Sequence, residues 1–306
     1  MQKMISFLLL LVFVGTYSSL QAYPIFPRTL SDVYKAADHV VYGKVKRLID
    51  VLIQADVDGI PPPPILHDGF AVFTIQEELK GTSNKTEIYI ATEHSVTCPT
   101  PFYFVEGQEL LLFLHKDGSE DFYWTHAMSY GGREVTPEEY LLYKEKLVVL
   151  QTILDYSNSE IQEKDYISWM ISCIKVPLMH WDGIFELLNE KEDENRNIVS
   201  NPYPLTEGQK GELRQIIMER EELINADLHL INYIKKENDP QLLIFLTMKF
   251  KTTMYSQFDY VFTSMATKLI ADLSQREDLI QLSKQIQEAY FSKEGEQLVE
   301  KFQALL

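Results

Sequence analysis

Apolar and polar positions between residues 39 and 128 follow the two-residue period of β-strands. In the segment 70–79, Phe73 and Ile75 alternate with Thr74, so one face of this strand should be buried and the other polar. A later segment is apolar almost throughout, as expected for a strand that is buried on both faces. The predicted strands are 39–53, 70–79, 86–91, 109–115 and 122–128, and their short spacing predicts a small barrel or sandwich.

Glycine and proline residues interrupt this pattern at defined places. Gly43 lies inside the first predicted strand, where a residue without a side chain indicates a β-bulge or a close approach of two backbones. Pro61–Pro64 should lie in a loop, because proline cannot donate to a sheet ladder.

Beyond residue 137 the apolar positions follow the period of α-helices. Thr136 and Pro137 are typical of an N-cap and a first helical position, and Asp239 and Pro240 repeat this pair. Further helices are predicted at 160–173 and 181–190, with a connection over 191–204. A stripe of apolar residues then steps by three and four positions through Tyr255, Phe258, Phe262, Met265 and Leu269.

One predicted helix, 241–250, is apolar nearly all round, which predicts that it lies at the centre of its domain. Antiparallel helix pairs joined by short turns would bury stripes of this kind if the pairs stacked on one another. The helical region shows no fixed sequence period, so it does not indicate a formal repeat family.

The first 22 residues have the layout of a secretory signal peptide. Met1–Ala22 contains one positive charge, Lys3, followed by an apolar run over 5–14. That run is too short to span a bilayer, which needs about 20 apolar residues. We therefore expect cleavage near Ala22, a mature chain that begins at Tyr23, and a secreted or periplasmic protein without a membrane span.

Charge narrows the classes of partner. The formal net charge is −17, and the charged residues are spread along the chain. An acidic surface repels phosphate backbones and anionic lipids, so we expect no nucleic-acid partner. The hydrophobic share of 45% indicates a chain that buries a core rather than a disordered polymer.

Three segments of the strand region carry a family resemblance: ADHVVYGKV at 37–45, FTIQEELKG at 73–81 and FVEGQELLLF at 104–113, with Cys98 before the last. In this order and spacing they resemble the TIMP-like (netrin-like) domain of bacterial secreted proteins, over about residues 37–132. The resemblance implies a five-stranded OB-like β-barrel with helices packed outside it. Many members have a second cysteine after the hairpin, where this chain has Met128 or Ser129.

The resemblance does not imply the inhibition performed by tissue inhibitors of metalloproteinases. That mechanism needs a cysteine at the mature N-terminus, whose amine and carbonyl ligate the zinc of the target enzyme. Tyr23 stands at this place in the expected mature chain. Similarity of fold alone does not carry a function.

Cys98 and Cys173 are the two cysteines of the chain. In an exported protein they could form one disulfide between the strand region and the helical region. The alternative is two buried free thiols. Two cysteines are too few for a four-thiolate zinc site, the seven histidines have no metal-ligand spacing, and no catalytic or nucleotide-binding motif occurs. We therefore expect no catalytic residue, metal site or cofactor.

Aromatic residues after the predicted hairpin form a candidate interaction surface. Tyr123, Trp124 and Tyr130 lie where OB folds often stack bases or sugars. The alternative is that these rings fill the core and surface of a small barrel.

Together these observations predict an α+β protein with a signal peptide at 1–22, a TIMP-like β-barrel domain at 23–135 and an all-helical domain of stacked helix pairs at 136–306. The predicted function is non-catalytic binding of a protein or peptide partner. The alternatives are a steric inhibitor of a secreted hydrolase, acting through the Pro61–Pro64 loop, and an enzyme. A cavity with convergent polar groups and shifted pKa values would favour the enzyme, and an exposed apolar patch would favour binding.

Overall fold

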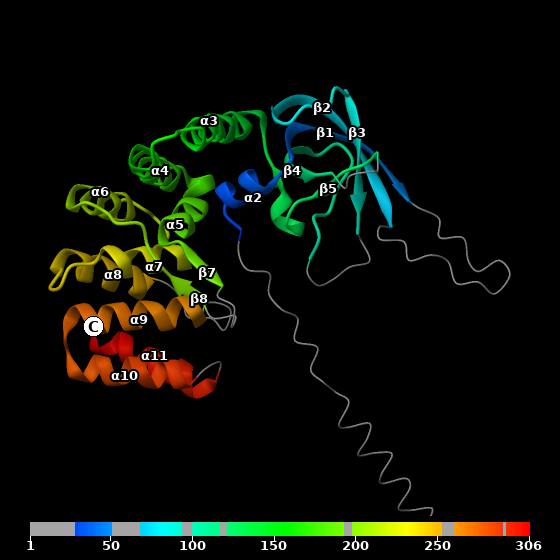
Figure 1. The fold of residues 1–306 in the computed structure, drawn as a ribbon. Helices are drawn as coiled ribbons and strands as arrows, with labels where there is room; N and C mark the ends of the chain where they lie inside the picture. Colours follow the sequence, from blue (N-terminus) through cyan, green and yellow to red (C-terminus); the bar gives the residue numbers. More distant parts are fainter. Residues whose placement is uncertain are drawn as a thin grey trace, which may run out of the picture. The chain divides into compact units, whose positions relative to one another are not determined.

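The computed structural model describes residues 28–50, 68–93, 100–116, 121–192, 198–252, 260–289 and 292–306. They form one larger antiparallel sheet, one two-stranded sheet and ten α-helices, so the predicted α+β class is confirmed (Figure 1). The predicted signal peptide, Tyr23 and the Pro61–Pro64 loop lie outside the described residues.

The chain divides into two compact units. The sheet unit contains Arg28 and residues 32–144, and the helical unit contains residues 29–31 and 145–306. The division falls inside helix α3 (Pro137–Leu154) rather than at the predicted boundary after residue 135. Near the start of the described chain, residues 29–31 thus belong to the helical unit, while Arg28 before them and residue 32 after them belong to the sheet unit.

The sheet unit is built on six strands: β1 (His39–Asp50), β2 (Gly69–Lys80), β3 (Glu87–Thr92), β4 (Glu109–His115), β5 (Trp124–Thr125) and β6 (Gly132–Glu134). Their order is β3-β2-β1-β4-β5, and β6 pairs with β4. Next to β5, Tyr123 forms a bridge to Ile90 of β3. Its N–H donates to the Tyr89 carbonyl at 2.9 Å, and its carbonyl accepts from Ala91 at 2.8 Å.

Alternate residues of these strands form the core of the unit. The cluster is wholly apolar apart from one tyrosine hydroxyl and consists of Val41, Val45, Ala71, Phe73, Ile88, Ile90, Phe104, Leu110, Leu112, Leu114 and Tyr123. The first turns of α3 also pack on the sheet, because Tyr140 stacks on Tyr42 with ring centroids 3.7 Å apart. The Tyr140 hydroxyl donates to Glu77 of β2 at 2.6 Å.

Gly43 occupies a β-bulge in β1, as its place in the sequence predicts. The register of β1 against β2 shifts between Tyr42 and Gly43. A Cβ atom at Gly43 would lie 2.0 Å from the Thr74 carbonyl oxygen, which is far inside van der Waals contact. The backbones of β1 and β2 can approach this closely only because position 43 has no side chain.

The predicted strand 122–128 is wrong in its extent, since β5 contains two residues. Ala127 and Met128 both have a φ of 57°, a left-handed conformation that ends the strand and begins the 3-10 helix Met128–Gly131. The alternation of aromatic residues in this segment imitates a longer strand. Helix α2 (Leu30–Ala36) was not predicted, because seven residues are too few to show a helical period.

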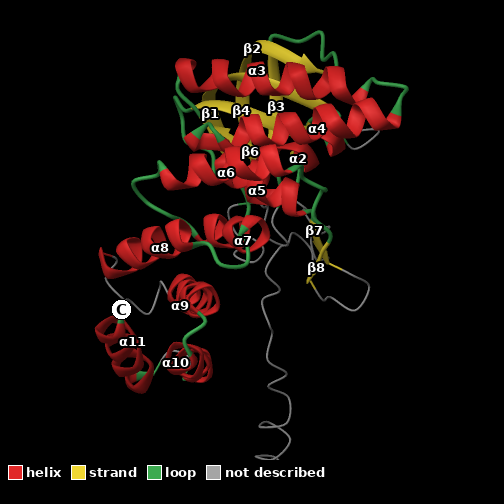
Figure 2. Cartoon of the chain, turned by 90° about the vertical axis from the view of Figure 1, so that its left-hand side faces the viewer, coloured by secondary structure: helices red, strands yellow, loops and turns green. Residues whose placement is uncertain are grey.

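The helical unit continues α3 and adds α4 (Ser159–Ile174), α5 (His180–Leu188), α6 (Glu207–Met218), α7 (Asn225–Ile234), α8 (Pro240–Thr252), α9 (Tyr260–Ser274), α10 (Glu277–Glu288) and α11 (Lys293–Leu305). Successive helices pack as pairs, and α5, α7 and α9 lie side by side. Figure 2 shows α9 and α10 nearly end-on as neighbours.

The predicted helix starts are confirmed at both marked positions. Thr136 Oγ1 accepts from the Glu139 N–H at 3.2 Å, and the Glu139 carboxylate accepts from the Thr136 N–H at 2.8 Å, which makes a capping box at the start of α3. Asp239 accepts from the Leu242 N–H at 3.0 Å at the start of α8.

Two expectations for the helical region are wrong in detail. The region is not all-helical, since β7 (Glu190–Glu192) and β8 (Ile198–Ser200) pair as a short antiparallel sheet. Strands of three residues are too short to show a period in the sequence. Helix α8 is not central either: Ile244 is 69% exposed and Met248 54%. An apolar sequence on all sides of a helix therefore did not mean burial on all sides.

Candidate functional site

Two adjoining hollows lie on either side of the connection between α6 and α7. One has a cavity volume of about 770 Å³, and the other of about 570 Å³. They share Glu221, Glu222 and Ile224 as lining residues, so we describe them together as the α6–α7 groove.

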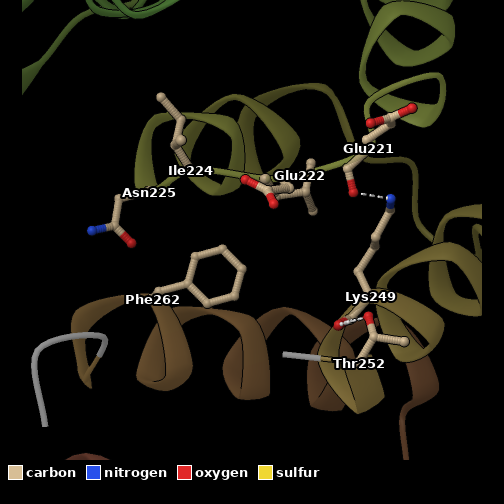
Figure 3. A pocket seen from close by; sticks show the side chains of 8 residues that line it. Glu221, Glu222, Ile224, Asn225, Lys249, Thr252 and Phe262 are labelled. Carbon is tan, nitrogen blue, oxygen red and sulfur yellow. Dashed lines mark hydrogen bonds between the residues drawn. The ribbon is translucent and has the colours of Figure 1, made fainter. Parts of the chain in front are cut away.

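The stacking of helix pairs brings the ends of several helices to this groove. Ile174 ends α4 and His180 begins α5, and both line the larger hollow together with residues of α6. Thr252 ends α8, and Phe262 lies in the first turn of α9, and both line the smaller hollow. Figure 3 shows the Phe262 ring pointing from α9 toward the connection that carries Glu222.

Arg220, which lines the larger hollow, forms an ionic contact with the buried Asp227. Arg220 Nε lies 3.3 Å from Asp227 Oδ1, and the Asp227 side chain is fully buried. Arg220 Nη2 donates to the Ile174 carbonyl at the end of α4, at 2.9 Å. Asp227 Oδ2 accepts from the Ile224 N–H at the start of α7, at 2.9 Å. This contact therefore ties the end of α4 to the connection and to the start of α7.

Burial is the largest influence on the pKa of the Asp227 carboxyl. It raises that pKa above its ordinary value, although the Ile224 N–H, Arg220 and His180 act in the opposite direction. Asp227 therefore has a fixed structural position and no exposed surface from which to meet a ligand.

His180 completes the polar wall of the larger hollow. Its Nδ1 lies 2.8 Å from the Pro177 carbonyl, an acceptor, so Nδ1 carries the proton of the neutral ring. Burial and the nearby Arg220 charge lower the pKa of His180. Nε2 is then an acceptor, and no group in the described part of the chain donates to it.

The exposed lining of the groove is acidic. The carboxylates among the described lining residues are Glu212, Glu219, Glu221 and Glu222. Lys175 pairs with Glu212 at 2.6 Å, and Lys249 Nζ donates to the backbone carbonyl of Glu221 (Figure 3). The carboxylates of Glu221 and Glu222 have no hydrogen bond or ion pair from residues within the described ranges.

The aromatic surface proposed from the sequence is only partly a surface. Tyr123 is 3% exposed and belongs to the sheet core, where its ring meets His39 edge-on at 5.1 Å. It is therefore not a surface contact residue, because its backbone pairing with β3 turns the side chain into the core. Trp124 and Tyr130 are half-buried.

Trp124 belongs instead to a row of rings that crosses the sheet. Its ring lies 5.6 Å from Phe122, which lies 5.3 Å from Phe70, and Tyr89 follows at 6.2 Å. The interplanar angles are between 62° and 87°, so these rings pack edge against face on one another. They do not form a flat platform of parallel rings for stacking bases or sugars.

The predicted disulfide stays a prediction. Cys98 lies outside the described residues, and Cys173 is a buried free thiol on α4. Burial raises the pKa of the Cys173 thiol to about 12, so it is neutral and unreactive as it stands.

The sequence did not reveal the groove. Glu221-Glu222-Leu223-Ile224 is an ordinary polar and apolar stretch between two helices, and only the neighbouring α4, α8 and α9 make it the floor of a cavity. Arg220 and Asp227 are seven residues apart and show no motif. The sequence offers one indication of this pair, an aspartate at 227 near the start of a helix, where such a side chain often caps the helix.

The described residues contain no cluster of three or more histidine, cysteine, aspartate or glutamate side chains able to hold a metal ion. No helix within the described ranges has the length and apolar character to cross a bilayer. Comparison of the chain with protein-family models, with curated proteins and with solved structures finds no match.

Proposed function

We propose that this protein is an exported, non-catalytic binding protein whose α6–α7 groove holds a segment of a partner protein. The observation that supports this function is the pair of adjoining hollows on the two sides of one connection, sharing Glu221, Glu222 and Ile224. Because the two hollows adjoin across one connection and are lined by the ends of several helices, they suit an extended peptide better than a compact small molecule.

The polar groups with shifted pKa values beside the groove serve its structure. Asp227 caps α7 and holds Arg220, which in turn holds the end of α4. His180 Nδ1 is engaged by a backbone carbonyl, and its Nε2 atom is buried. A general base must reach its substrate directly or through one water, so this arrangement favours binding over catalysis.

For the sheet unit we infer a closed, OB-like barrel of the TIMP-like type. The pairing of Tyr123 with β3 supports closure, because it joins the neighbourhood of β5 to the strand at the opposite edge. The single apolar cluster drawn from β1 to β4 supports it as well. The steric-inhibitor alternative rests on the Pro61–Pro64 loop, outside the described residues, so the groove is the better supported site.

The binding function is tested by selecting peptides on the mature chain, residues 23–306, from a random displayed library. Ile224, 36% exposed, is replaced by tryptophan to fill the groove, and Ile161, 51% exposed at the far end of α4, receives the same change as a control. We expect a selected family of peptides that binds the wild type and I161W but not I224W. Peptides that bind I224W as well as the wild type, or a selection that yields none, would contradict the function.

A further inference from the structure

We propose that the segment held in the α6–α7 groove is basic, with lysine or arginine side chains beside an apolar one. This inference rests on the proposed function and names the chemistry of its partner. Four carboxylates line the groove in the described chain, and those of Glu221 and Glu222 are exposed and unpaired within it. A cationic segment would place its charges against them.

The cations of the chain itself show that the groove suits ammonium and guanidinium groups. Arg220 donates to the Ile174 carbonyl at 2.9 Å, and Lys249 donates to the Glu221 carbonyl. Lys249 Nζ also lies 5.5 Å from the centre of the Phe245 ring, a cation–π contact. The C-terminal ends of α4, α6 and α8 and the N-terminal ends of α5, α7 and α9 all lie at the groove, so the helix dipoles offset one another and the side-chain carboxylates set its charge.

These internal contacts leave acidic groups in excess. Lys175 is paired with Glu212, and Arg220 is neutralised by the buried Asp227, so among the described lining residues Lys249 is the cation that stands against the three carboxylates of Glu219, Glu221 and Glu222. His180 adds no positive charge, because burial and the Arg220 charge lower its pKa and Nδ1 carries the proton of the neutral ring. An acidic segment would therefore meet repulsion along the connection, while a basic one would meet acceptors.

Apolar side chains between the carboxylates supply the second half of the recognition. Ile216 lines the larger hollow, Phe262 lines the smaller one, and Ile224 belongs to both. Glu222 extends beside the Phe262 ring in Figure 3, so an apolar side chain and a cation one or two residues apart could be held together. Charge alone would recognise any polycation, and the apolar anchors restrict the groove to a peptide.

The test measures the composition and the affinity of the selected peptides. We expect enrichment in lysine or arginine next to leucine, isoleucine or an aromatic residue. The double variant E221Q/E222Q should bind such a peptide roughly three- to tenfold more weakly, as the loss of two exposed ion pairs predicts. The control E160Q/E163Q makes the same charge change near the start of α4, roughly 20 Å along that helix from Ile174, and should leave binding unchanged.

Raising the salt concentration from about 0.05 to about 0.5 M should weaken the peptide complex with the wild type but hardly affect that with E221Q/E222Q. Selected peptides that are neutral or acidic, yet are lost in I224W, would overturn the basic segment and leave the binding function standing. Equal losses in both double variants would also overturn it, since attraction would then come from overall charge. Full competition by spermidine at the concentration of the peptide would overturn it too, because no apolar anchor would be needed.

Discussion

The two units of the protein bury different kinds of side chain. Among the described residues of the sheet unit, one polar side chain, that of Thr92, is buried, and the rest of the core is apolar or aromatic. The described helical unit buries three aspartates, Asp182, Asp227 and Asp239, together with several hydroxyl groups.

The difference follows from how each unit provides hydrogen-bond partners for its backbone N–H and C=O groups. Strands inside a sheet pair their N–H and C=O groups with neighbouring strands, so no side chain is needed. Each helix begins with N–H groups that have no partner inside the helix, and stacking helix pairs buries those ends. Asp227 and Asp239 accept from such N–H groups at the starts of α7 and α8, and Asp182 accepts from the Leu30 N–H at 2.7 Å.

The substitution with the largest expected effect on stability is Asp227→Ala, in the helical unit. Removing the carboxylate leaves the largely buried Arg220 without its charge partner and the Ile224 N–H without an acceptor. We expect the free energy of unfolding of the helical unit to fall by about 3–5 kcal/mol. Denaturation followed by far-UV circular dichroism measures this change.

Asp272→Ala is the control, because the pair of Asp272 with Lys235 at 3.3 Å lies on the surface and should contribute less than about 1 kcal/mol. Equal effects would show that burial of the charge does not matter.

The corresponding destabilising substitution in the sheet unit is Gly43→Ala. Its Cβ would lie 2.0 Å from the Thr74 carbonyl oxygen, and the atom in the way is backbone that cannot swing aside. We expect a loss of about 3 kcal/mol in the free energy of unfolding, by strain rather than by loss of a polar partner. Circular dichroism should follow the transition, and tryptophan fluorescence should follow it too, with Trp124 reporting on the sheet unit and Trp169 and Trp181 on the helical unit.

Gly211→Ala is the matched control for this substitution. Gly211 lies in α6, and an added Cβ would meet nothing within 4 Å. Because alanine favours a helix over glycine, the variant should be more stable by about 1 kcal/mol. A loss of stability here would mean that the α6 position has a constraint that the structure does not show.

The smallest expected effect concerns acid stability. Burial alone would raise the pKa of Glu77, but the hydrogen bonds from Lys144 and Tyr140 outweigh it and place the pKa below its usual value. The contribution of Glu77 is therefore present above the unfolded value of 4.5 and is lost as the pH falls through the folded value. Glu77→Gln should lower the free energy of unfolding by about 0.5–1 kcal/mol at neutral pH, because the group is partly exposed.

Denaturation of Glu77→Gln and the wild type across acidic pH checks the sign. The two proteins should become equal once the pH is low enough to protonate the carboxyl in both the folded and the unfolded state. For Asp227 the pH dependence has the opposite sign: burial raises its pKa, so its ionisation costs the folded state free energy and this cost appears as the pH rises through the folded value. A constant difference for Glu77→Gln at all pH values would contradict the ion pair as its cause.

Much of the fold could be predicted from the sequence because it depends on local rules. The alternation along 70–79 and the apolar run 109–115 identified β2 and β4, and the run matches β4 residue for residue. Thr136 and Asp239 marked the starts of α3 and α8, and Gly43 marked the bulge. Each of these features acts within one strand, one turn or one close backbone contact.

The tertiary structure decided what depends on residues far apart in the chain. The exposure of Ile244, the burial of Tyr123 and the short hairpin of β7 and β8 each reflect which neighbours are present, and a local period does not contain that information. The groove is the clearest case. Ile174, Ile224 and Phe262 line adjoining hollows only because helix pairs stack and bring their ends together. By itself the sequence determined the elements and their caps, since these follow from the chemistry of a few adjacent residues, whereas the cavity and its buried ion pair exist only once separate helices pack.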